Sequence, residues 1–139
     1  MWWIYALLSA LFAALTAIFA KIGIKNINTD LAVAIRTVVI LFMAWAIVFF
    51  RNGLSQAASL TKANMLFLAL SGITTGLSWL FYFRAIDIGK VSQVAPVDKL
   101  SLALTVIFSV IFLGETISFK TAVGATCIVA GTLIMIWGN

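Results

Sequence analysis

Hydrophobic residues gather into five long runs along the chain, and short polar segments separate the runs. The runs cover residues 3–20, 31–50, 65–83, 91–113 and 119–137. A helix needs about 20 apolar residues to cross a bilayer core of roughly 30 Å, and each run is near that length. The pattern therefore predicts an all-α, polytopic membrane protein with five transmembrane helices, forming a single domain over residues 1–139.

The last connection contains residues that typically end one helix and begin the next. Gly114 follows Leu113 directly, and glycine is the residue most often found just after a helix. Either Thr116 or Ser118 is suited to cap the following helix through its hydroxyl oxygen. Because the connections are short, we expect neighbouring helices to run antiparallel.

The composition of the chain excludes most kinds of catalytic and metal-binding site. Of the 139 residues, 64% are hydrophobic and 9% are charged, with one cysteine, four carboxylates and no histidine. Most metal sites, thiol redox pairs and histidine-based catalytic groups need residues that this chain lacks. We therefore expect no enzyme activity, no catalytic or metal site and no cofactor. The basic residues are dispersed, so no nucleic-acid partner is expected either.

Basic residues are almost equally divided between the two sides of the predicted membrane protein. One side carries Lys21, Lys25, Arg84 and Lys90, and the other carries Arg51, Lys62 and Lys120. An excess of lysine and arginine on one side orients a membrane protein, so the charges of this chain hardly favour either orientation in the membrane. One hypothesis is that copies insert both ways; the other is that some different feature sets a single orientation.

Three charged residues lie inside the apolar runs. Arg36 is five residues into the second run, about 7–8 Å from its start, and Asp98 is seven residues into the fourth, about 10–11 Å deep. Both runs start on the same side, so the sequence predicts an Arg36–Asp98 pair. The pair either forms a functional polar centre or only locks two helices together. Lys99 points about 100° away from Asp98 and is expected to extend toward the headgroups.

Hydroxyl-bearing residues recur at helical spacing beside these charges. The fourth run has Asp98, Ser101, Thr105 and Ser109, and the third run has Ser71, Thr75, Ser78 and Tyr82. Such faces either line a water-accessible cavity or form hydrogen bonds between packed helices. The candidate substrate cavity consists of Arg36, Asp98, Ser101, Thr105, Tyr82 and Trp79. Pro96 removes a backbone hydrogen bond and is predicted to kink the fourth helix.

Short motifs within these runs resemble a known family. Ser92-Gln93-Val94-Ala95-Pro96, Leu100-Ser101, Leu113-Gly114-Glu115, Ala34-Ile35-Arg36-Thr37 and the stretch from Trp79 to Ile86 resemble the EamA family of the drug/metabolite transporter superfamily. The resemblance implies export or exchange of small metabolites through a central cavity by alternating access. Most members carry ten helices as two inverted five-helix halves, and this chain is similar to one half. Small multidrug transporters of the superfamily use a glutamate in helix one, which this chain lacks.

The combined expectation is a small-molecule transmembrane transporter that works by alternating access as an antiparallel, dual-topology homodimer. Its partners would be a small-molecule substrate, the lipid bilayer and a second copy of the chain, in the cell (inner) membrane as a multi-pass protein. Two alternatives remain: a non-transporting membrane subunit, and half of a heterodimer that flips a lipid-linked intermediate. A homodimer needs no charge bias, whereas an obligate heterodimer usually has two chains of opposite bias.

Overall fold

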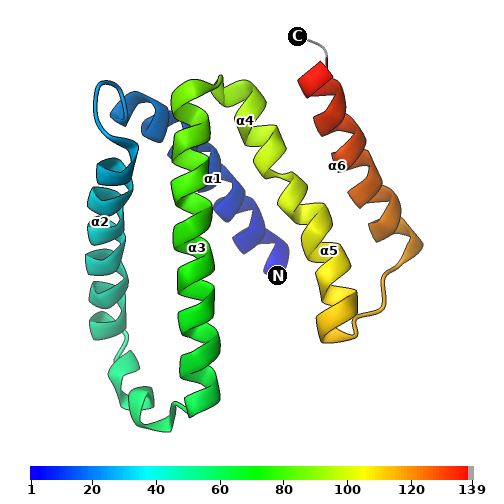
Figure 1. The fold of residues 1–139 in the computed structure, drawn as a ribbon. Coiled ribbons are helices and arrows are strands. Elements are labelled where there is room, and N and C mark those ends of the chain that lie inside the picture. The colour runs from blue at the N-terminus through cyan, green and yellow to red at the C-terminus, as the bar shows by residue number, and fades with distance from the viewer. Residues whose placement is uncertain (138–139) are drawn as a thin grey trace. The chain divides into compact units, whose positions relative to one another are not determined.

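The structure, a computed structural model, describes residues 1–137 apart from the side chains of residues 56–58, and this part of the chain contains helices but no strand (Figure 1). The elements in order are α1 (Trp2–Gly23), α2 (Thr29–Phe50), η1 (Gly53–Ser59), α3 (Lys62–Ile88), α4 (Val91–Asp98), α5 (Leu100–Leu113) and α6 (Phe119–Trp137). Five helical segments are long and apolar enough to cross a membrane, with α4 and α5 together forming the fourth. The all-α prediction with five transmembrane helices is confirmed.

The first three helices extend beyond their apolar runs, most of all α3, whereas the fourth span and α6 have the bounds of their runs. That helix covers Lys62–Ile88, whereas its apolar run covers only residues 65–83. Hydrophobicity marks the part of a helix that needs lipid, while the backbone hydrogen bonds continue into the polar headgroup region. The apolar pattern therefore locates the membrane core better than it locates the helix ends.

Side-chain and backbone caps define where several helices begin and end. The Asn28 side chain accepts hydrogen bonds from the backbone N–H groups of Asp30 (2.7 Å) and Leu31 (3.3 Å) at the start of α2. Ser118 Oγ accepts from the backbone N–H of Thr121 at 3.1 Å, so Ser118 caps α6. Gly114 ends α5 in the left-handed region, with a φ of 67°. These contacts agree with the capping residues expected for the last connection.

The chain divides into two compact units: Met1–Ile18 with Ile88–Asn139, and Phe19–Asp87. In the first unit, α6 packs against both α4 and α5. In the second, η1 packs against α2 and connects it to α3 (Figure 1). The single domain over residues 1–139 stays a prediction.

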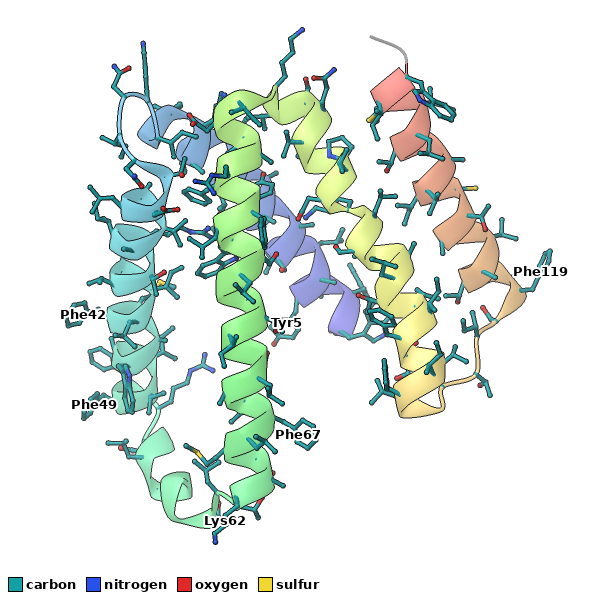
Figure 2. All side chains as sticks on the ribbon, viewed as in Figure 1. Tyr5, Phe42, Phe49, Lys62, Phe67 and Phe119 are labelled. Carbon is teal, nitrogen blue, oxygen red and sulfur yellow. The ribbon has the colours of Figure 1, made fainter. Side chains whose placement is uncertain are left out.

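Few of the described side chains are buried, and most large apolar ones are exposed. The exposed fraction reaches 90% for Phe50, and the labelled aromatic side chains in Figure 2 extend away from their helices. An apolar surface this extensive is unfavourable in water but is matched to lipid or to another apolar chain. The exposure therefore agrees with a protein that is stable within a bilayer.

The fourth span is interrupted at Lys99, where α4 ends and α5 begins. Pro96 lies three residues earlier and has no backbone N–H, so it cannot donate to the carbonyl one turn before it. The Lys99 backbone N–H donates to the carbonyls of Ala95 (3.3 Å) and Pro96 (3.0 Å), a tighter turn than in a regular α-helix. The two helical segments thus meet at the charged Asp98–Lys99 pair.

We expect Gly114→Ala to destabilise the protein by about 1 kcal/mol, because an L-residue is strained in the left-handed region. A Cβ added at Gly124 meets no atom within 4 Å, and Gly124 has helical φ, so Gly124→Ala should be neutral or stabilising. Unfolding of both variants in detergent would measure the difference. Equal stability of the two variants would contradict the role given to the φ of Gly114.

Candidate functional site

Arg36 lies on the less exposed face of α2. The half-buried and buried positions of this helix recur at three- and four-residue spacing, at Thr29, Ala32, Val33, Arg36 and Ile40. This is the spacing of one helical face. Arg36 is seven residues after the first residue of α2, about 10 Å along the helix. Its charge therefore lies within the apolar span.

The opposing face of α3 is aromatic. The less exposed positions in its last turns include Gly76, Trp79, Tyr82, Phe83 and Ile86, again at helical spacing. Phe83 is 2% exposed and Ile86 is fully buried, so this face holds the best-packed side chains of the unit Phe19–Asp87. Phe83 is thus packed among neighbouring side chains, whereas Trp79, on the same face, is half-buried.

The Arg36 guanidinium lies over two rings of this face. Its Cζ atom is 4.2 Å from the ring centroid of Trp79 and 5.5 Å from that of Phe83. Both distances are within the roughly 6 Å range of a cation–π contact, which stabilises by about 0.5–2 kcal/mol. Tyr82, on the same face, is close enough to interact electrostatically with Arg36. The structure therefore brings together three of the predicted cavity residues.

No carboxylate of this unit neutralises Arg36. Among the described residues of Phe19–Asp87, neither Asp30 nor Asp87 forms an ion pair with it, and its N–H groups make no hydrogen bond. A guanidinium has five N–H donors in one plane. The aromatic rings compensate part of the charge, while these in-plane donors keep their capacity to bind an acceptor.

Lys21 stabilises the C-terminal end of α3 through hydrogen bonds. Its Nζ donates to the backbone carbonyls of Ile86 and Asp87, the latter at 3.2 Å. The last carbonyls of a helix have no partner within the helix, and a cation there is also favoured by the helix dipole. In the sequence Lys21 is recognisable only as a loop charge, because no pattern shows which distant helix end a lysine reaches. The contact stabilises the α3 turns that follow Trp79 and Phe83.

In the other unit, the Asp98 carboxylate pairs with its neighbour Lys99. Lys99 Nζ is 3.1 Å from Asp98 Oδ2, and the side chains of Lys99 and Asp98 are 51% and 34% exposed, respectively. An ion pair that exposed contributes little to stability. Lys99 was expected to extend to the headgroups, and here it contacts Asp98 instead. Arg36 and Asp98 belong to different units, and their pairing stays a prediction.

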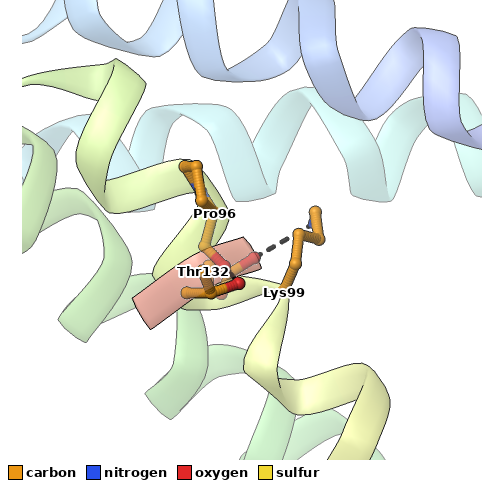
Figure 3. Close-up of polar contacts among 4 residues, drawn as sticks. Pro96, Lys99 and Thr132 are labelled. Atoms are coloured by element: carbon orange, nitrogen blue, oxygen red, sulfur yellow. Dashed lines mark hydrogen bonds and ion pairs between the residues drawn. The ribbon is translucent and has the colours of Figure 1, made fainter. Parts of the chain in front are cut away.

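Thr132 connects α6 to α4 at the interrupted span. Its hydroxyl has one proton, which it shares between the carbonyl of Ile128 at 2.8 Å and that of Pro96 at 3.3 Å, and the residue is 4% exposed. Pro96 and Thr132 are labelled in Figure 3. Thr132 is not among the residues predicted from the sequence. The available signal was a lone hydroxyl beside Gly131 in an apolar run, which does not reveal the distant carbonyl that it contacts.

Three hydroxyls of the predicted polar faces donate to carbonyls of their own helices. Thr105 Oγ1 donates to the carbonyl of Ser101 at 2.8 Å, Ser109 Oγ donates to that of Val106 at 3.0 Å, and Thr75 Oγ1 donates to that of Ser71 at 2.7 Å. A hydroxyl paired in this way does not need a donor bond to a neighbouring helix. Ser101 and Thr105 are also exposed, so their free lone pairs are accessible to water or to a second chain.

We expect a double-mutant cycle of Arg36→Gln with Trp79→Leu to give a coupling of about 1 kcal/mol, since each change removes one half of the cation–π contact. The free energy of unfolding in detergent would measure it. Trp45, a tryptophan of α2 that pairs with Phe49, supplies the control. Trp45→Leu should be additive with Arg36→Gln. Additive effects for Trp79 as well would contradict the contact.

Comparison with known proteins places the chain in a family. Residues 1–137 match the EamA-like transporter family. A protein of a Sinorhizobium species, named "Uncharacterized transporter in cobO 3'region", is 49% identical over 134 residues, which cover 96% of this chain and 95% of that protein. No solved structure matches. The predicted membership of the EamA family is confirmed, as is an integral, multi-pass membrane protein. The chain belongs to the EamA-like transporter family.

Proposed function

We propose that the chain carries a small molecule across the cell's inner membrane by alternating access, and that it does so as an antiparallel homodimer. The observation that carries the proposal is Arg36, a charged residue within a span that contacts Trp79 and Phe83 rather than a carboxylate of its own unit. A charge in this position is costly, and such residues usually mark the path of an ion or a substrate.

The need for a second copy follows from the small number of helices and their low burial. Each of the five candidate spans is at most 6% buried, although a substrate path must be enclosed on all sides. The alignment with the Sinorhizobium protein covers 95% of that relative, so it too has about one five-helix length. Transporters with inverted repeats place the substrate between two such units. Two antiparallel copies would supply the same arrangement.

The interrupted fourth span supports alternating access. Transporters often place discontinuous helices beside the substrate, because the freed backbone groups can face it. Here α4 ends at Asp98 and α5 begins at Leu100, and Thr132 holds the Pro96 carbonyl close to this break. The break is a position at which the two halves of the span can change their mutual angle.

Dual topology predicts that a reporter on the C-terminus is active on both sides of the membrane, because neither side has a clear excess of basic residues. The double variant Leu54→Lys with Ser55→Lys adds two charges to the connection between α2 and α3. It should shift the population toward one orientation, with that connection in the cytoplasm and the C-terminus outside.

The matched control is Leu54→Gln with Ser55→Gln, which changes the same positions without charge and should leave both orientations. Reporter activity on only one side for the unaltered chain would exclude the antiparallel homodimer. The hypothesis would then be a transporter formed by this chain together with a second, different chain.

A water-filled path predicts fast thiol labelling on the polar face of α5. In a Cys127→Ala background, Ser101→Cys and Thr105→Cys should react with a small hydrophilic thiol reagent at least tenfold faster than Leu102→Cys. All three positions are exposed on the chain itself, so lipid rather than the fold would protect Leu102. The rates would be measured in native membranes.

Equally slow labelling of the three positions in membranes would show that no water reaches the polar face. That outcome would favour the non-transporting membrane subunit over a carrier.

A further inference from the structure

We infer that Arg36 binds the negatively charged group of the transported molecule, so that the substrate is a small organic anion bearing a carboxylate or phosphate. This inference rests on the proposed function, because it takes Arg36 to line the transport path. The structure contributes the arrangement of Arg36 over Trp79 and Phe83, at 4.2 Å and 5.5 Å from the ring centroids.

The aromatic contacts orient the guanidinium without using its hydrogen-bonding capacity. A guanidinium that stacks on a ring interacts through its face, whereas its N–H donors lie in its plane. Those donors form a fork that matches the two oxygens of a carboxylate or phosphate. The described residues of Phe19–Asp87 leave this fork without an acceptor. Trp79 and Phe83 therefore hold Arg36 in a conformation that is ready to bind an anion.

The charges of the unit Phe19–Asp87 favour an anion over a cation. Asp30 is in the first turn of α2, six residues before Arg36, or about 9 Å along the helix. Lys21 is engaged with the carbonyls at the end of α3. A positive charge within a span is stabilised by a negative partner and opposed by a second positive one. An anionic substrate would supply that partner at each transport cycle, and a cationic one would meet repulsion.

The neighbouring rings favour an anion with an apolar body over an inorganic ion. Trp79 and Tyr82 are half-buried, so part of each ring is open to a ligand that contacts Arg36. Phe83, which is buried, is the second ring that Arg36 contacts. A planar organic acid could place its charged group on Arg36 and its body against these rings.

The test uses the full-length protein in nanodiscs of phosphatidylcholine and four compounds of one shape: benzoate, phenyl phosphate, neutral benzamide and cationic benzylamine. Ligand-dependent thermal stabilisation measures binding. We expect at least one of the two anions to bind at least tenfold more tightly than benzamide, with no binding of benzylamine. The relative affinity of benzoate and phenyl phosphate distinguishes a carboxylate substrate from a phosphate. Weaker binding of both anions than of benzamide would overturn the inference.

Substitutions assign the binding to Arg36. Arg36→Gln should abolish the preference for anions, and Arg36→Lys, which keeps the charge but loses the fork, should weaken anion binding about tenfold. Arg84→Gln is the matched control, because Arg84 is an exposed arginine of the same helix turn as Phe83. It should leave the preference unchanged. If Arg36→Gln does not fold, the four compounds on the unaltered protein and Arg36→Lys still decide the matter.

Lipid headgroups also carry phosphate, and a second nanodisc separates this source from a free molecule. Replacing half of the lipid by phosphatidylglycerol should leave the affinity for benzoate and phenyl phosphate within threefold. A loss of binding larger than tenfold would show that the site takes a lipid headgroup and would overturn a free anion as the cargo.

The outcome separates this inference from the proposed function. Anion binding that is no tighter than benzamide binding, combined with fast labelling at Ser101→Cys and Thr105→Cys, would overturn the substrate class while the carrier stands. Selective anion binding without that labelling would instead remove the transport path and leave Arg36 as a binding residue of a membrane subunit.

Discussion

The bilayer core has no water to solvate a charge or to accept a backbone hydrogen bond, and this constraint explains most features of the chain. Each span is a helix because only a helix satisfies its backbone groups internally. Arg36 lies over Trp79 and Phe83, because the face of an aromatic ring carries partial negative charge and attracts a cation where water is absent. Thr75, Thr105 and Ser109 donate to carbonyls of their own helices for the same reason.

In the α2–α3 pair, a well-packed helix end lies close to the residues that we propose bind the substrate. Phe83 and Ile86 are buried, and Lys21 binds the last carbonyls of α3, so the end of this helix is well held. Arg36 and Trp79, one or two turns further in, are only half-buried. A binding residue profits from such support, because a side chain that is already oriented loses less conformational entropy when a ligand arrives.

In the α4–α6 contact, an irregular stretch of helix is held in place by particular hydrogen bonds. Pro96 prevents a regular hydrogen bond, and Thr132 and the backbone N–H of Lys99 both donate to the Pro96 carbonyl. Because Pro96 has no N–H, the carbonyl one turn earlier lacks its usual donor, whereas the Pro96 carbonyl itself accepts from two donors. The break in the helix is thus defined by particular contacts, and a rearrangement of Thr132 is a local way to alter it. The charged Asp98 lies directly at this break.

The sequence by itself determined the number and approximate position of the spans, the glycine end of α5 and the family, because these depend on local apolar length, backbone conformation and short motifs. It narrowed the cap of α6 to Thr116 or Ser118, and the structure selects Ser118. It also identified Arg36, Trp79 and Tyr82 as candidates, since a charge within an apolar run is visible without a structure. Only the tertiary structure decided which side chains meet. Arg36 over Trp79, Lys21 on the end of α3 and Thr132 on Pro96 join residues that are 36 to 65 positions apart, and no periodic pattern encodes such distances.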